Sequence, residues 1–156
     1  MKHSFLMVVA FMTMIVCSAS SCDKSDDNSN NTPENTTPMA NGKIKIRVGP
    51  QTFTATLLDN NSAKAFKEML PLTINMIELN NNEKYYDLPN SLPTNSSNPG
   101  TIKNGDLMLY GSKTLVLFYK TFSTSYSYTK LGSIDDVNGL TSALGTGNVT
   151  VTFEKE

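Results

Sequence analysis

Residues 43–58 read KIKIRVGPQTFTATLL, and this stretch indicates the class of fold most clearly. Apolar and basic side chains alternate over residues 43–48, which is the period of a half-buried strand. Gly49-Pro50 then turns the chain, and residues 51–58 alternate between apolar side chains and threonine. The pattern predicts a β-hairpin and therefore an antiparallel sheet.

The rest of the sequence predicts further short strands and two helices. Residues 59–62 offer N-cap side chains for a helix that Pro71 stops. A second helix is expected over residues 134–144, where we interpret Asp135 and Asp136 as caps. Further strands are expected at residues 72–79, 83–88, 106–110, 114–122, 126–131 and 148–153.

A long segment rich in Pro, Gly, Asn and Ser, residues 89–105, is predicted to be either a binding loop or a mobile cover. The chain has no βαβ rhythm and no internal repeat. About eight strands and two short helices therefore predict a mainly β domain, an antiparallel barrel with helices at its ends.

The charges of the chain are balanced. It has 13 Lys and Arg against 14 Asp and Glu, a net charge of -1. Because it has no net positive field of the kind that drives non-specific nucleic-acid binding, we expect no nucleic-acid partner.

The first 21 residues have the parts of a secretory signal peptide: a short basic start, an apolar run over residues 5–16 and a small-residue stretch. The apolar run is shorter than the roughly 20 residues that cross a bilayer. Residues 19–22 (ASSC) resemble a bacterial lipobox, so we expect Cys22 to become the lipidated first residue of the mature chain. The alternative is an ordinary secreted protein with a free cysteine near its end.

This processing would remove His3, the one histidine, together with Cys17, and lipid would occupy the other cysteine. The mature chain would then have no histidine and no thiol. That excludes Ser-His-Asp and Cys-His catalysis and histidine-based zinc sites.

Residues 23–42 have no aromatic side chain and few aliphatic ones, so they predict a disordered tether. Their acidic cluster, Asp23, Asp26 and Asp27, resembles the signal that exports Bacteroidetes lipoproteins to the cell surface, although a solvated run of charges is the alternative. We expect an outer-membrane lipoprotein on the periplasmic or the cell-surface face. The predicted division is a signal peptide (1–21), a lipidated cysteine with its tether (22–42) and a folded domain (43–156).

Four short motifs in the folded part resemble the bacterial cyclophilin-like domain family. They are NEKYYDLP (82–89), GDLMLYG (105–111), LVLFYKTFSTSYSYTKL (115–131) and GSID (132–135). The resemblance covers essentially all of residues 43–156. It implies a closed eight-stranded antiparallel β-barrel capped by two short helices.

Cyclophilins twist an Xaa-Pro bond with an arginine that supports the distorted amide, beside histidine, tryptophan and other pocket residues. This sequence has no Trp, would lose its histidine, and has a single arginine, Arg47, inside the first strand. We therefore predict no catalytic residues. A divergent peptidyl-prolyl isomerase remains the alternative, because another donor could bind the twisted amide selectively.

The resemblance places a ligand site on the outer face of the barrel, beneath the long loop. Tyrosines and hydroxyl side chains give flat apolar faces with polar tips, which suit a peptide or a glycan. About half of these residues are alternatively core or cross-strand pairs, and within residues 114–122 the pattern leaves open which parity faces inward. The candidate ligand-binding residues are Tyr85, Tyr86, Tyr110, Phe118, Phe122, Ser123, Ser125, Tyr126, Tyr128 and Arg47.

For Arg47 two interpretations stay open: a solvated strand face shared with two lysines, or a contact with an anionic ligand group. The carboxylates Glu78, Glu83, Asp87 and Asp106 do not have the spacing of a paired acid and base or of a calcium loop. We expect no metal and no cofactor.

The sequence thus predicts a lipid-anchored, monomeric envelope protein whose cyclophilin-like domain binds a peptide or a glycan without catalysis. Two alternatives belong to other classes: a divergent prolyl isomerase that serves envelope protein folding, and an accessory lipoprotein of a glycan-uptake system.

Overall fold

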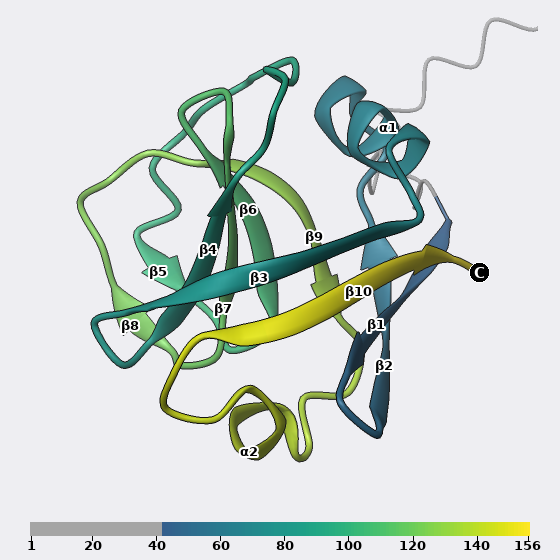
Figure 1. The fold of residues 1–156 in the computed structure, drawn as a ribbon. Coiled ribbons are helices and arrows are strands. Elements are labelled where there is room, and N and C mark those ends of the chain that lie inside the picture. Colours follow the sequence, from purple (N-terminus) through teal and green to yellow (C-terminus); the bar gives the residue numbers. More distant parts are fainter. Residues whose placement is uncertain (1–41) are drawn as a thin grey trace, which may run out of the picture. The chain divides into compact units, whose positions relative to one another are not determined.

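The structure of the protein, a computed structural model, describes residues 42–156 (Figure 1). Its elements are β1 (Lys43–Val48), β2 (Gln51–Leu57), α1 (Asn61–Glu68), β3 (Leu72–Leu79), β4 (Glu83–Asp87), β5 (Thr101–Ile102), β6 (Asp106–Tyr110), β7 (Thr114–Phe118), β8 (Phe122–Ser123), β9 (Thr129–Ile134), α2 (Leu140–Leu144) and β10 (Val149–Lys155). Within these residues, eight strands close an antiparallel barrel in the order β1-β10-β3-β4-β7-β6-β9-β2, and β5 pairs with β8 in a separate sheet. The predicted mainly β barrel with two helices is confirmed.

The predictions for the N-terminal segments lie outside the described residues. These are the signal peptide at 1–21, the lipidated Cys22 and the tether up to residue 41. Within the described part, neither helix is long and apolar enough to cross a membrane.

The predicted hairpin is formed by β1 and β2. Ile44 faces Ala55 and Ile46 faces Phe53, and all four side chains are buried in the barrel interior. The alternate residues of β1 are exposed. Burial of one face of each strand is what the period-2 pattern of this segment requires.

Helix α1 begins where the polar run predicts. The Asn60 side chain accepts a hydrogen bond from the backbone N–H of Ala63 at 2.8 Å, which caps the helix. Phe66 packs edge-to-face on Phe153 of β10, with ring centroids 5.6 Å apart. This contact joins the helix to the barrel core, and α1 and α2 lie at opposite ends of the barrel (Figure 1).

The strand expected over residues 114–122 is divided in the structure. β7 ends at Phe118, and β8 belongs to the separate sheet. Between them, the backbone N–H of Tyr119 donates to the carbonyl of Asn82 at 3.0 Å. The apolar pattern continues past the end of β7 because Phe122 packs on Phe118 outside the barrel, with ring centroids 5.7 Å apart.

The predictions for residues 126–144 also need correction. β9 starts at Thr129 rather than at residue 126 and extends to Ile134, where the helix was expected to begin. Helix α2 covers only residues 140–144. The apolar spacing that predicted a longer helix is shared between the end of a strand, a turn and one short helix.

Asp135 and Asp136 do not cap α2, whose N-cap position has no side-chain hydrogen bond. The Asp135 carboxylate instead accepts a hydrogen bond from Thr56 at 2.6 Å and pairs with Lys43 at 3.2 Å. The Asp136 side chain accepts from the backbone N–H of Asn138 at 2.9 Å. Both aspartates therefore fix the turn between β9 and α2.

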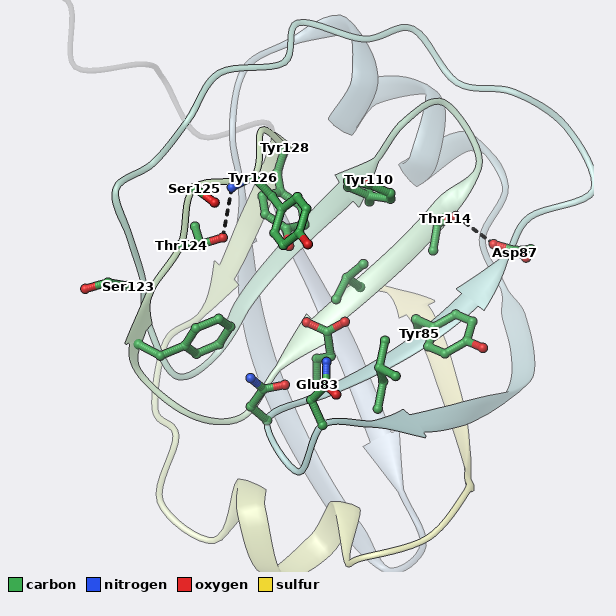
Figure 2. A pocket seen from close by; sticks show the side chains of 15 residues that line it. Glu83, Tyr85, Asp87, Tyr110, Thr114, Ser123, Thr124, Ser125, Tyr126 and Tyr128 are labelled. Carbon is green, nitrogen blue, oxygen red and sulfur yellow. Dashed lines mark hydrogen bonds between the residues drawn. The ribbon is translucent and has the colours of Figure 1, made fainter.

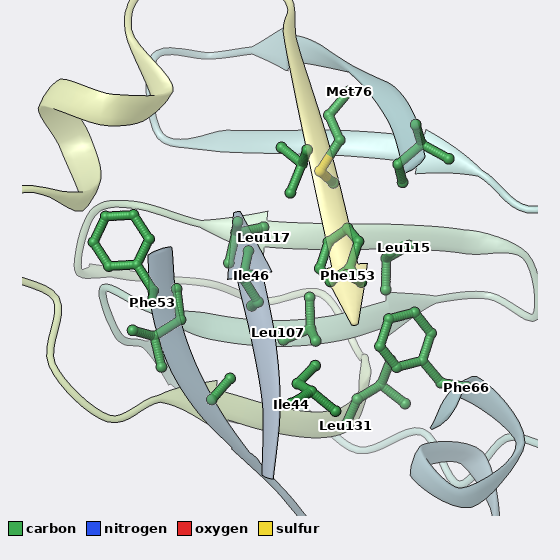
Figure 3. Packing of buried hydrophobic residues seen from close by; sticks show 14 of the residues in the cluster. Ile44, Ile46, Phe53, Phe66, Met76, Leu107, Leu115, Leu117, Leu131 and Phe153 are labelled. Atoms are coloured by element: carbon green, nitrogen blue, oxygen red, sulfur yellow. The ribbon is translucent and has the colours of Figure 1, made fainter. Parts of the chain in front are cut away.

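The structure settles which side of β7 faces inward. Leu115 and Leu117 belong to the main core inside the barrel, where Figure 3 shows them among its packed side chains. Val116 and Phe118 face outward into a second, smaller cluster. β7 is therefore apolar on both faces, as expected of a strand that is covered on both sides.

The long loop, residues 89–105, is fastened to the barrel. The backbone N–H of Leu92 donates to Ser112 O at 2.8 Å, and Ser97 and Tyr128 exchange two backbone hydrogen bonds of 3.0 Å. The loop ends in β5, which pairs with β8 and positions that short strand beside the outer face of the barrel.

Candidate functional site

The outer faces of β4, β7 and β6 form the floor of the candidate site. Alternation along β4 directs Glu83, Tyr85 and Asp87 to the outside, whereas Lys84 is fully buried and Tyr86 packs against the barrel core. The facing pairs on β4 and β7 are Glu83 with Phe118, Tyr85 with Val116 and Asp87 with Thr114.

At the end of β4, where Asp87 lies, this floor carries a polar pair and a tyrosine. The Thr114 hydroxyl donates to the Asp87 carboxylate at 2.7 Å. On the next strand, β6, Tyr110 faces Thr114 and continues the row. The registers of three neighbouring strands therefore place carboxylate, hydroxyl and phenol groups side by side.

A second apolar cluster supports the floor from outside the barrel. Phe118 packs edge-to-face on Tyr128, with ring centroids 5.5 Å apart. The other members are Ile102, Met108 and Val116, with Tyr85 and Phe122 packed against them. Packing in this cluster restricts the side chains on which a ligand would rest.

The segment from β8 to the start of β9 forms a wall beside this floor. Floor and wall enclose a cavity of about 550 Å³, hereafter the outer cavity. Its volume is within the usual range of small-ligand sites. Figure 2 shows its side chains. The lining residues are Leu79, Asn80, Asn82, Glu83, Tyr85, Asp87, Tyr110, Thr114, Val116, Phe122, Ser123, Thr124, Ser125, Tyr126 and Tyr128.

Most of the candidates predicted from the sequence line the outer cavity. Those that the structure brings together there are Tyr85, Tyr110, Phe122, Ser123, Ser125, Tyr126 and Tyr128. The family resemblance implied a site beneath the long loop, but no residue of that loop lines the cavity. The wall comes instead from residues 122–126 and Tyr128.

Three candidates lie elsewhere. Tyr86 packs against the barrel core, and Phe118 is fully buried beneath the cavity floor. Arg47 is on β1, across the barrel from β7 in the strand order, where it pairs with Glu154 at 3.1 Å. The structure therefore places Arg47 on a solvated face with a charged partner.

The sequence reasoning missed part of the lining. Glu83 and Asp87 were considered only as metal or acid-base residues, and yet they flank Tyr85 at a spacing of two, which directs all three to one face of a strand. That spacing was a usable signal. The remaining missed residues are Leu79, Asn80, Asn82, Thr114, Val116 and Thr124.

The exposed apolar residues of the described part gather at this cavity. The large hydrophobic side chains that are most exposed are Ile77, Leu79, Tyr110 and Tyr126, at 40%, 41%, 47% and 62%. Three of them line the cavity, and Ile77 on β3 faces Tyr85 of β4. Exposed apolar side chains that are gathered in one place indicate a surface that contacts another molecule.

The electrostatics of the cavity are dominated by Glu83. Burial, and then the negative charge of Glu78, raise the pKa of the Glu83 carboxyl above its ordinary value. Burial and the charge of Glu83 likewise raise the pKa of Tyr128, so that this phenol stays protonated at neutral pH. Within residues 42–156, no group of three or more side chains is arranged to hold a metal ion.

Lys84, next to Glu83 in the chain, lies on the opposite side of β4. Its ammonium group donates to Glu78 and to the carbonyls of Gly145 and Gly147, at 2.9 and 2.6 Å for the two carbonyls. It also lies 5.2 Å from the centroid of the Tyr119 ring. Lys84 thus holds the segment between α2 and β10 against the barrel and is not part of the outer cavity.

The fold is a closed antiparallel β-barrel of the cyclophilin-like class, with a cavity on its outer face. A sequence profile of the cyclophilin-like family matches residues 46–154, and the chain belongs to that family. A comparison with curated proteins found no match.

Among solved structures, the chain is similar to the solution structure of a hypothetical protein from Archaeoglobus fulgidus. The TM-score is 0.51 and the identity 15%, over 78% of this chain and 99% of the archaeal one. At this identity the likeness shows a shared fold.

Proposed function

We propose that the cyclophilin-like domain binds a peptide or a glycan in the outer cavity and leaves it chemically unchanged. The observation that carries this proposal is the gathering of exposed apolar side chains at the cavity. Keeping such side chains in contact with water is unfavourable for an isolated domain, and a bound ligand would cover them. The hydroxyl and amide groups among the lining residues supply hydrogen bonds that orient a ligand.

Binding without catalysis is supported by the composition of the cavity. Within the described residues, its lining has no Arg, Lys or His. A twisted prolyl amide would therefore find no cationic donor there of the kind on which cyclophilins rely. No observation favours the isomerase alternative.

We further propose that the domain acts in the cell envelope, anchored to the outer membrane through lipid on Cys22. Support comes from the sequence: an apolar run too short for a bilayer span, a lipobox-like ASSC and a polar tether. A lipid anchor with a flexible tether would allow the cavity to meet ligands some distance from the membrane surface.

The test combines binding with one lining variant. The purified protein is applied to a starch matrix and, separately, titrated with Xaa-Pro peptides. Tyr126→Ala should reduce binding at least several-fold, because Tyr126 forms one wall and an exposed side chain can be shortened with little effect on the fold. Lys45→Ala, on the opposite side of the barrel, serves as the matched surface control. Equal binding by both variants would contradict the proposal.

The same samples test for catalysis. Cis/trans exchange of the Xaa-Pro peptides is followed by NMR, and we expect it to stay at the uncatalysed time of roughly tens of seconds. Faster exchange in the presence of the protein would overturn the non-catalytic part of the proposal.

A further inference from the structure

The outer cavity is acidic. Its two ionisable carboxyl groups belong to Glu83 and Asp87, and no lining residue within the described part carries a positive charge. Asp87 is at the exposed end of the cavity and accepts a hydrogen bond from Thr114. Glu83 is therefore the charge that a ligand would meet inside.

Glu83 differs from the other shielded carboxylates of the domain. Within residues 42–156, it has no hydrogen bond or ion pair through its side chain, although it is half-buried. The other partly buried carboxylates each have a cationic partner. These pairs are Glu78 with Lys84, Asp106 with Lys130 and Glu154 with Arg47. A half-buried carboxylate without a cation is energetically unfavourable, and a cation from outside would relieve this.

Tyrosine side chains lie on two sides of this carboxylate (Figure 2). Figure 2 shows the Glu83 carboxylate in the middle of the lining side chains, between Tyr85 and the pair Tyr126 and Tyr128. Tyr126 and Tyr128 each stand at an angle to a further tyrosine of the lining, Tyr110: the Tyr110 and Tyr126 rings are at 89°, with centroids 6.2 Å apart, and the Tyr110 and Tyr128 rings are at 52°, with centroids 5.6 Å apart.

This arrangement favours a compact cation over a flat sugar. A sugar ring stacks best on a flat aromatic platform, whereas rings at steep angles form the sides of a cage. The faces of tyrosine rings carry partial negative charge and attract ammonium and guanidinium groups. A carboxylate among such rings, as in Figure 2, can form an ion pair with the cation in a partly desolvated place.

We propose that the outer cavity binds a peptide through a basic side chain, whose ammonium or guanidinium group pairs with Glu83 among Tyr85, Tyr126 and Tyr128. This rests on the proposed function, because it names the ligand class of the same cavity. The neutral hydroxyl and amide groups of the lining would then contact the peptide backbone on either side of the basic residue.

The test uses three probes with the full-length protein: a pentapeptide with a central lysine between glycines, the same peptide with the lysine acetylated, and a neutral maltooligosaccharide. Binding is measured by calorimetry at low and at moderate salt. We expect the lysine peptide to bind at least about tenfold more tightly than the acetylated one, because acetylation removes the charge and keeps the stem. Its affinity should also fall as salt rises.

Two variants test whether the Glu83 carboxylate is the group that pairs with the lysine side chain of the peptide. Glu83→Gln should weaken binding of the lysine peptide about tenfold and leave binding of the acetylated peptide nearly unchanged. The reason is that glutamine has nearly the same shape as glutamate but no charge. Glu156→Gln removes the same charge from an exposed position beyond β10 and should change neither affinity.

The outcomes separate this inference from the proposed function. If the acetylated peptide or the maltooligosaccharide binds as tightly as the lysine peptide, and Tyr126→Ala weakens that binding, the cavity is a binding site but not one for cations, and this inference is wrong. If Glu83→Gln does not change the affinity for the lysine peptide, the inference is also wrong. Failure of all three probes to bind would contradict both proposals.

Discussion

Glu83 and Lys84 are adjacent in the chain, and the β period places them on opposite sides of one barrel wall. Lys84 is fully buried, with its ammonium group satisfied by Glu78 and by the carbonyls of Gly145 and Gly147. Glu83 faces the outer cavity and has no such partners among the described residues. One charge stabilises the fold, and the other is the charge that we propose a ligand contacts.

Replacing Lys84 by Met tests the structural half of this contrast. The methionine keeps most of the stem but removes the cationic partner of Glu78, which retains the Tyr119 hydroxyl and the Asn81 N–H as donors, and it leaves the two glycine carbonyls without the ammonium donor. We expect a loss of about 3 kcal/mol or more in the free energy of unfolding, which is typical when one partner of a buried pair is removed. Urea unfolding followed by circular dichroism measures it.

The matched control is Lys64→Met. Lys64 is about half exposed and pairs with Asp59 at 2.8 Å on the surface, so its loss should cost less than about 1 kcal/mol. If both variants unfold at the same urea concentration, Lys84 does not hold the segment between α2 and β10 as described.

Glu83→Gln should stabilise the protein at neutral pH. Because the pKa of Glu83 is higher in the folded than in the unfolded state, the fold loses stability as the pH rises from the unfolded-state pKa to the folded-state pKa, and the loss is complete above the latter. The gain from glutamine should therefore be present at about pH 7 and disappear at about pH 3, where the carboxyl is protonated in both folded and unfolded chains. Unfolding curves at both values measure it, with Glu156→Gln as control. A variant that is less stable at neutral pH would mean that Glu83 has a stabilising partner.

From the sequence, the chemical character of the candidate residues could be predicted better than the surroundings of each residue in the fold. The tyrosines of the cavity could be named because the family resemblance implies a ligand site on the outer face of the barrel, and tyrosine side chains have flat apolar faces with polar tips that suit binding. That Phe118 lies beneath the floor and Arg47 across the barrel could not be predicted, because both depend on which strands become neighbours when the barrel closes.

At the scale of elements, closure between β2 and β9 depends on a small residue. Gly132 of β9 faces Leu57 of β2, and a Cβ atom at Gly132 would lie 2.3 Å from the carbonyl oxygen of Thr56 and 3.0 Å from the Cα of Leu57. Both are backbone atoms, so no side-chain movement relieves the contact.

Gly132→Ala should therefore destabilise the barrel by about 1–3 kcal/mol or more, because the two strands must separate locally. Thermal unfolding measures the loss. Gly147→Ala is the control: a Cβ there meets nothing within 4 Å, so we expect a change near zero or a slight stabilisation. Equal melting temperatures for the two variants would contradict the close approach of β2 and β9.

Elements with a clean period were predicted well, and elements with mixed signals were not. β1, β2 and the Asn60 cap follow from alternation and from one side chain. The helix predicted over residues 134–144 was too long, because acidic residues before an apolar spacing suggest a helix start. In the structure the Asp135 carboxylate instead binds Thr56 and Lys43 of the neighbouring hairpin. A tertiary contact of that kind leaves no local signal.

At the scale of the whole molecule, the family and the fold agree: a cyclophilin-like sequence and a closed barrel. The proposed lipid anchor concerns the segments before the barrel. Cys22→Ser should move the protein from the membrane fraction to the soluble fraction of bacterial cells, because the serine cannot carry the thioether-linked lipid. Fractionation with labelled palmitate measures this. A serine variant that stays in the membrane fraction would contradict anchoring through Cys22.

The central claim is that the outer cavity is where this domain meets its ligand. The most direct test is a map of amide chemical-shift changes when the lysine pentapeptide, the acetylated peptide or the maltooligosaccharide is added to the labelled protein. We predict that the largest changes for the probe that binds fall on β4 around Glu83 and Tyr85 and on the wall around Tyr126, with little change around Arg47 on β1. Largest changes on β1 and β2, or the same small changes over the entire barrel, would contradict it.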